Sequence, residues 1–390
     1  MFRAGDQSID AAGGVAVPLP IPKSGKRLEI KRRLLPFSFW PVARSTRRYG
    51  LQTDLFAKDP WVVTMSFVEK RCPSIAKPAA RAFLTQAKEF FGASEAGATT
   101  SKPLLLYYSF LNIAKALVLT TGTVTNLDFA RHGLSETLLP PGREFLDAAL
   151  DIFSATATSK NIYDLLNQAL GNVGLPAQAQ VKVLDLLPQI VLGHRLWATA
   201  TREVERFVPI HELRFYVDAR QKTVWLSIMV LSEDLDRFEI SQTAVLRGSG
   251  LQGIFRGVQC SETVDGKPLL QFEQIGSMGY THRPSDVIQA LVNGQKSRFW
   301  PIVRTFPPYR KYYLYLAPQA SVPQNHLCTM YALMYYLGSV TRYRPQHFIA
   351  IEKSSYGPEI EDFLVTAPAQ FLFLMASEFA LRNVSSPAIL

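Results

Sequence analysis

The last helical segment of the chain constrains the fold more than any other feature. From about Glu359 to Arg382 the apolar residues follow helical spacing. The block after residue 320 is too short to bury this segment by itself, so its large apolar side chains need a partner surface. The simplest partner is the other helical block, residues 75–203. The side chains to be covered are Phe363, Phe371, Leu372, Phe373, Leu374, Met375, Phe379 and Leu381.

A β-rich stretch separates the two helical blocks. Phe207–Val217 and Thr223–Leu231 are rich in β-branched and aromatic residues and flank Asp218–Lys222, which predicts a β-hairpin. The predicted class is α+β, with a mainly helical core formed by the N- and C-terminal helical blocks and a β-rich, mostly antiparallel insertion. The expected parts are a basic, partly disordered arm (1–48), a helical domain (49–203), the insertion (204–320) and C-terminal helices (321–390).

Apolar spacing and turn residues predict the remaining elements. Helices are expected over Lys77–Gly92, Ser101–Gly122, Gly142–Ser154, Asn161–Leu170, Gln178–Ala200, Asp286–Asn293, Asn325–Tyr343 and a short segment from Pro345. Strands are expected over Gln242–Phe255, Val264–Ile275 and Tyr312–Leu316, whereas Trp40–Phe67 is expected to be irregular with one short strand.

One apolar segment is long enough to cross a bilayer, namely Pro103–Val124. Asn112 and Lys115 lie at its centre, where a lysine costs about 3 kcal/mol on insertion. We therefore expect a buried core helix and no membrane span. Lys115 is expected either to meet an anionic group or to extend its stem to the surface. The C-terminal helix is a poor surface anchor, because anionic lipid would repel its acids Glu359, Glu361, Asp362 and Glu378.

The positive charge is concentrated in two blocks of a chain whose net charge is +10. Residues 23–48 hold nine basic residues and one acid, and no acid occurs between Val287 and Ala350. Such blocks favour RNA or DNA as partner, although a solvated arm and a protein partner are the alternatives. Aromatic residues near the second block could stack on bases. The expected nucleic-acid contacts are Lys26, Arg27, Arg32, Arg33, Arg298, Arg304, Arg310, Lys311 and Arg344.

Several classes of protein are disfavoured by what the sequence contains. Its three cysteines lie far apart, which argues against a disulfide scaffold and a zinc module. No two histidines or cysteines have ligand spacing, so no metal or cofactor is expected. The basic run follows the mildly apolar Gly13–Pro22 instead of preceding it, and Asp6 and Asp10 are unlike a transit peptide. A cytoplasmic location is expected.

Two segments carry a family resemblance. One is Tyr107-Tyr108-Ser-Phe-Leu-Asn-Ile-Ala-Lys-Ala-Leu with Arg131-His132-Gly133-Leu134 after a short gap, and the other is Leu337-Gly-Ser-Val-Thr-Arg-Tyr-Arg-Pro345. Together they resemble the YaaC-like family of bacterial proteins, which has no settled activity to transfer. Tyr107, Asn112, Lys115 and His132 are the polar candidates within the first segment.

The tyrosine-containing helix is also similar to the opening helix of HEPN domains. That resemblance implies a metal-independent ribonuclease with an arginine and a histidine a few residues apart, as in bacterial anti-phage defence. Arg342 and His347 have this spacing. Arg342 would clamp phosphate and His347 would be the general acid or base, with Pro345 bending the chain so that both face one pocket. The alternative is a structural Arg342 that bonds helix-end carbonyls.

The function expected from these features is that of a cytosolic, nucleic-acid-associated accessory or effector protein, with ribonuclease activity as an open hypothesis. The alternative is a non-enzymatic, partner-binding subunit of a larger complex.

Overall fold

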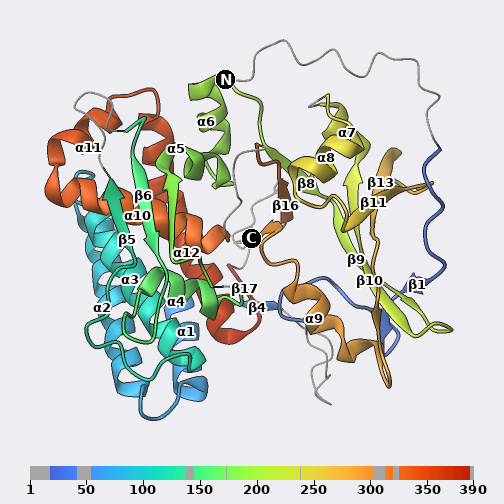
Figure 1. Cartoon of the computed structure of the whole chain (residues 1–390), viewed down its shortest axis with the longest axis horizontal. Coiled ribbons are helices and arrows are strands. Elements are labelled where there is room, and N and C mark those ends of the chain that lie inside the picture. The colour runs from blue at the N-terminus through green and yellow to red at the C-terminus, as the bar shows by residue number, and fades with distance from the viewer. Residues whose placement is uncertain are drawn as a thin grey trace.

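The two largest hydrophobic clusters belong to two units that lie side by side, one helical and one β-rich (Figure 1). The structure is a computed structural model, and it describes residues 18–41, 54–137, 145–172, 174–237, 239–301, 312–318 and 325–386. It confirms the α+β class with a β-rich, antiparallel insertion between two helical blocks.

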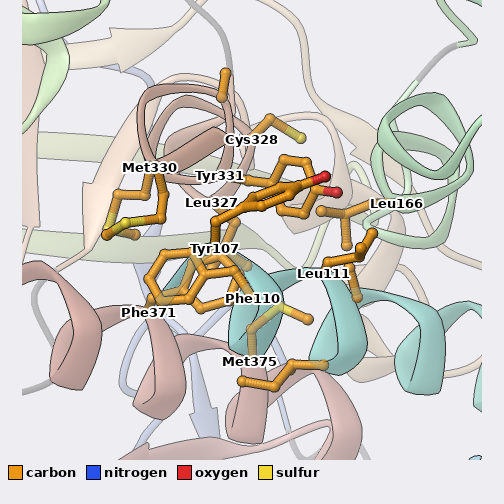
Figure 2. Packing of buried hydrophobic residues seen from close by; sticks show 14 of the residues in the cluster. Tyr107, Phe110, Leu111, Leu166, Leu327, Cys328, Met330, Tyr331, Phe371 and Met375 are labelled. Carbon is orange, nitrogen blue, oxygen red and sulfur yellow. The ribbon is translucent and has the colours of Figure 1, made fainter. Parts of the chain in front are cut away.

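The helical unit is built from both ends of the chain. Its single buried cluster includes residues from Val68 to Trp197 and from Leu327 to Val384. Figure 2 shows the junction, where Phe110 stacks on Phe371 with ring centroids 3.7 Å apart. The shared core is therefore confirmed. The main helices are α1 (Pro60–Arg71), α2 (Lys77–Ala96), α3 (Lys102–Thr121), α10 (His326–Tyr343), α11 (Pro345–Glu352) and α12 (Gly357–Ala380).

Helix α1 was not expected from the sequence. Asp59 caps it by accepting a hydrogen bond from the Trp61 amide, and Pro60 occupies the first helical position. The single short strand expected here is found as β4 (Asp54–Phe56), but the prediction of irregular structure from Pro60 to Phe67 is wrong because this capping signal outweighs the scattered aromatic residues. Just before the helix, strand β4 pairs in parallel with β17 (Asn383–Ser385).

A three-stranded antiparallel sheet covers part of the helical unit, in the order β5 (Leu134–Thr137), β6 (Ala149–Phe153) and β7 (Gln178–Lys182). Helices were expected over the described part of Gly142–Ser154 and at the start of Gln178–Ala200, and both expectations are wrong. Asp151 explains the pairing, since it accepts hydrogen bonds from Thr137 and Gln180 on the two neighbouring strands. Cross-strand partners override helix propensity here. The region also holds α4 (Ile162–Ala169), α5 (Val183–Leu186), η1 (Leu187–Gln189) and α6 (His194–Thr201).

The main sheet of the β-rich unit has the strand order β1-β9-β10-β13-β11. The expected hairpin is confirmed as β9 (Glu212–Asp218) and β10 (Thr223–Leu231), with Asp218 opposite Thr223. The other strands are β1 (Lys26–Arg27), β11 (Phe255–Val258) and β13 (Lys267–Gln274), with β12 (Thr263–Val264) and β14 (Met278–Gly279) at the side. A second sheet contains β8 (Phe207–Ile210), β15 (Phe299–Pro301) and β16 (Tyr312–Tyr315).

One expected strand of this unit is instead a helix, α8 (Gln242–Gly248), because Ser241 caps it by accepting from the Ala244 amide. The expected helix ending at Gly294 is confirmed as α9 (Ile288–Asn293), preceded by η2 (Pro284–Asp286). A short helix α7 (Ser232–Asp236) follows β10.

The described part of the N-terminal arm belongs to the β-rich unit. Strand β1 pairs with β9, and a small hairpin follows, made of β2 (Glu29–Ile30) and β3 (Arg33–Leu34). Five side chains from this segment are buried in the β-rich core: Leu28, Leu35, Phe37, Phe39 and Trp40. Residues 1–17 and 42–48 of the expected arm lie outside the described residues.

Helices α3 and α12 are long and apolar enough to cross a membrane by length and composition. Within the structure, 72% of the apolar window of α3 and 78% of that of α12 are buried. The core helix predicted around Lys115 is thus found as a mostly buried helix that ends at Gly122 in the left-handed conformation.

Candidate functional site

Helices α2 and α3 form a ladder of polar and aromatic contacts. Tyr108 stacks on Phe90 with ring centroids 5.4 Å apart, and Asn112 donates to Gln86 at 2.8 Å. The Lys115 ammonium lies 5.0 Å from the centroid of the Phe83 ring. Residues 108, 112 and 115 share one face of α3 because they are four and three residues apart. The ladder therefore holds Lys115 at one edge of the helix pair.

Tyr107 connects this helix pair to His132. Its phenolic oxygen lies 2.5 Å from Nδ1 of His132, and its ring contacts the edges of Tyr331 and Tyr335 on α10. Helix α10 can come this close because residue 338 is glycine, where a Cβ atom would lie 2.7 Å from the Tyr107 Cβ. Figure 2 shows Tyr107 and Tyr331 in the helical core.

We assign the Tyr107 phenol as the donor in this pair. Burial raises its pKa, so the phenol keeps its proton. We assign that proton to a hydrogen bond toward Nδ1 of His132, which leaves the ring's own proton on Nε2. Nε2–H of His132 is then a donor with no partner among the residues that the structure describes.

The backbone around His132 is held by the start of α4. The Tyr163 amide donates to the His132 carbonyl at 3.1 Å, and the Ile162 amide donates to the Arg131 carbonyl at 2.9 Å. Gly133 follows with φ of 79°, a conformation that favours glycine. The pKa of His132 is lowered, first by partial desolvation and then by the positive charges of Lys115 and Arg342.

Arg342 reaches the same place from the last turn of α10. Its guanidinium donates to the Tyr108 hydroxyl at 2.7 Å and lies 5.0 Å from the centroid of the exposed Tyr343 ring. Lys115 is half-buried, and desolvation lowers its pKa. Within the described residues, neither Lys115 nor Arg342 has a carboxylate partner. We call Tyr107, Tyr108, Lys115, His132 and Arg342 the Tyr107 site.

The expected catalytic pair lies on the helices that the sequence predicts. Arg342 is in the last turn of α10, Pro345 begins α11, and His347 is in the first turn of α11. Their known neighbours differ, since Arg342 bonds Tyr108 whereas His347 acts electrostatically on Glu136. The pairing of the two residues as a catalytic unit stays a hypothesis.

Glu136 on β5 organises the surface beside the Tyr107 site. Arg344 lies 3.6 Å from its carboxylate. Burial raises the pKa of Glu136, against the opposing effects of Ser339, Arg344 and His347. Arg344, expected to contact nucleic acid, therefore has an acidic neighbour.

Some of the side chains expected to contact nucleic acid are exposed, and others are half-buried or paired with an acid. Lys26, Arg32 and Arg33 are exposed, whereas Arg27 pairs with Glu212. Arg298 is half-buried, and desolvation lowers its pKa. The remaining three, Arg304, Arg310 and Lys311, lie outside the described residues.

Sequence reasoning missed part of the site and identified the rest. Tyr107, Lys115 and His132 were expected and belong to the Tyr107 site with Arg342, whereas Asn112, also expected, bonds Gln86 on α2. Tyr108 was missed as a site residue, although its spacing with Asn112 and Lys115 could have shown it. No group of three or more His, Cys, Asp or Glu residues that could hold a metal ion occurs in the described ranges.

The model of a protein family described as YaaC-like protein matches residues 51–379. The chain belongs to the YaaC-like family. The match includes both segments that carry the resemblance in the sequence, and hence every residue of the Tyr107 site. No curated protein and no solved structure matches the chain. Membership of the YaaC-like family thus stands on the family model, while the HEPN resemblance stays a hypothesis.

Proposed function

We propose that this YaaC-like protein binds nucleic acid and holds a backbone phosphate at the Tyr107 site. The observation that carries the proposal is the convergence of Lys115, His132 and Arg342 from three separate segments. Two of these groups are cations, and the described residues offer neither of them a carboxylate. Lys115 and Arg342 both act electrostatically on His132, and cations that lack a carboxylate partner are stabilised by a bound anion.

The donors suit a phosphate group. The Arg342 guanidinium and the Lys115 ammonium supply positive charge, and Nε2–H of His132 supplies a neutral donor. Tyr343 is 64% exposed beside Arg342 and offers a face on which a base could stack. Phosphate contacts and stacking together favour a single-stranded ligand, with RNA as the first to test.

Titration of the protein with a fluorescent single-stranded RNA, followed by anisotropy, tests the proposal. At about 50 mM salt we expect binding that weakens steeply toward about 200 mM, because phosphate binding displaces counterions. Lys115→Met and Arg342→Gln should each weaken binding about tenfold and reduce the salt slope by roughly one. Arg220→Gln, at an exposed turn of the β-rich unit, is the matched control and should bind like the wild type.

Two results would overturn the proposal. One is the absence of RNA and DNA binding at about 50 mM salt, which would favour the partner-binding subunit instead. The other is wild-type affinity in both site variants. Ribonuclease activity is a separate question, because the Tyr107 site as described supplies donors for binding and no assigned base.

A further inference from the structure

The β2–β3 hairpin interrupts the edge of the main sheet. Lys26 and Arg27 pair with Val217 and Tyr216 on β9, and the Leu28 amide donates to the Phe215 carbonyl. The chain then leaves the sheet and returns where the Leu35 amide donates to the Leu28 carbonyl at 3.0 Å. Leu28 and Leu35 are buried, so the base of the hairpin is anchored in the core.

Two residues at the tip of this hairpin have a backbone conformation that is unfavourable for their side chains. Ile30 pairs with Arg33, which leaves Lys31 and Arg32 as a two-residue turn. Their φ values are 52° and 61°, and positive values at both positions are those of a type I′ turn. Asn-Gly is the preferred sequence for that turn, because side chains such as lysine and arginine crowd the backbone there. The turn therefore places two cations at a cost in local stability.

Basic residues of the hairpin differ from two of those on the adjoining sheet in whether they form ion pairs. On the sheet, Arg27 pairs with Glu212, and Arg214 pairs with both Glu212 and Glu262. On the hairpin, Lys31, Arg32 and Arg33 are exposed and have no acidic partner among the residues that the structure describes. Arg27 and Arg214 are thus neutralised on the sheet, whereas the three cations of the hairpin, like the neighbouring Lys26, are left without an acidic partner among the described residues.

We infer that the β2–β3 hairpin is a second nucleic-acid contact, in which Lys31, Arg32 and Arg33 bind backbone phosphates. The inference rests on the proposed function for the class of ligand. It adds a site in the other unit, because β1 and the Tyr107 helix α3 lie on opposite sides of the molecule (Figure 1).

This separation sets the length of ligand that can engage both sites. A chain of this size has a radius of gyration of about 21 Å, so opposite sides are roughly 50 Å apart. An oligonucleotide of about 8 residues is too short to reach both, whereas one of about 40 residues can. The hairpin should therefore raise the affinity for long ligands by a second, linked contact.

The deciding variant is Lys31→Asn with Arg32→Gly in the full chain. It installs the preferred turn sequence and removes two cations, so stability and binding should change independently. We expect an unchanged or higher Tm, about tenfold weaker binding of a 40-residue RNA at about 50 mM salt, and a salt slope reduced by about 1.4. Binding of an 8-residue RNA should stay within about twofold of the wild type.

The outcomes also separate this inference from the proposed function. Wild-type affinity of the double variant for the 40-residue RNA, with the Tyr107 site variants impaired, overturns the hairpin contact alone. Failure of the wild-type protein to bind either RNA removes both. Binding of polyglutamate without binding of RNA would assign the hairpin to an acidic protein instead. Arg220→Gln again serves as control, because Arg220 is an exposed cation in another turn of the same sheet.

Discussion

The phenolic oxygen of Tyr107 is 2.5 Å from Nδ1 of His132, which joins a residue of the helical core to one on the surface. Tyr107 is only 5% exposed, whereas His132 is exposed on its outer side. A change in the protonation of His132, or in what it binds, therefore alters a hydrogen bond of Tyr107, whose ring packs between α3 and α10.

Tyr107→Phe tests this connection. It removes the donor to Nδ1 while keeping the ring contacts with Tyr331 and Tyr335, so we expect a loss of about 1 kcal/mol in unfolding free energy. The His132 ring should then sample both neutral tautomers, which 15N NMR of the imidazole reports. An unchanged tautomer and unchanged stability would contradict the assigned hydrogen bond.

RNA affinity should depend on pH through His132. Desolvation and, to a smaller extent, the charges of Lys115 and Arg342 hold the pKa of this histidine below 6.5 in the free protein, and a bound phosphate would raise it. Affinity should therefore increase as the pH falls through and below about 6.5, since binding takes up a proton. His132→Gln should flatten this dependence. Equal slopes in the variant and the wild type, measured by anisotropy from about pH 5.5 to 7.5, would exclude His132 from the site.

The lowered pKa of His132 also makes the unfolding free energy of the free protein depend on pH. This dependence is opposite in sign to that of RNA affinity. A histidine whose folded pKa is depressed favours folding while it is neutral, so its contribution is complete above about 6.5 and is lost as the pH falls toward the folded value. Lowering the pH should thus reduce the unfolding free energy of the free protein and increase its affinity for RNA.

Glu359 should make stability fall as the pH rises. This side chain is 3% exposed, its Oε2 atom has no partner among the described residues, and burial with Asp362 nearby raises its pKa to about 8. The folded protein thus binds a proton that the unfolded chain releases above about 4.5. Its stabilising effect is complete below that pH and declines by up to about 1.4 kcal/mol per unit toward pH 8.

Glu359→Gln removes the titrating group at nearly constant shape. The variant should be more stable than the wild type at about pH 8 and should show a flatter denaturation midpoint between about pH 5 and 8. Asp362→Asn is the matched comparison, because it should lower the pKa of Glu359 and shift the decline to a lower pH. Parallel stability curves for all three proteins would show that Glu359 does not titrate in this range.

The ribonuclease hypothesis predicts cleavage that survives EDTA and leaves a 2′,3′-cyclic phosphate, because the 2′-OH attacks and no metal set is expected. His347→Ala and Arg342→Ala should each slow such cleavage by a factor of about 10² to 10⁴. Arg206→Ala and His211→Ala are controls with the same spacing, at the two residues that flank strand β8. Wild-type cleavage by the Arg342→Ala, His347→Ala double variant would reject the hypothesis.

The shared helical core makes the first block dependent on the last. Phe371→Ala removes the ring stacked on Phe110 and should cost about 3–5 kcal/mol of unfolding free energy. A fragment of residues 1–205 should fail to fold, because it lacks α10 and α12. A soluble fragment with native helix content by circular dichroism would contradict the shared core.

Long periodic segments and the β9–β10 hairpin could be predicted from the sequence, whereas strands β6 and β7 could not. Helices α3 and α10 match their predicted ranges within about a residue because their caps, Gly122 and Asn325, are strong local signals. Strands β6 and β7 were predicted as helix, since their pairing depends on Asp151 and on partners distant in the chain.

The candidate site shows the same division. Tyr107, Lys115 and His132 could be found as polar residues in or near an apolar helix. Their meeting with Arg342 depends on the close approach of α10 at Gly338, which no local pattern reveals. The basic hairpin was foreseen as charge, but its strained turn was not, because Lys-Arg is not a turn signal.

The parallel pairing of β4 with β17 has a consequence for synthesis of the protein. Asn383 pairs with Asp54, so β4 cannot form its pairing until β17, 329 residues later in the chain, has been made. Until then α3 lacks the partner helix α12, and its apolar side chains stay uncovered while the β-rich unit is translated. Folding of the helical unit is therefore completed only after α12 and β17 have been made, and the nascent chain should need chaperone protection through that interval.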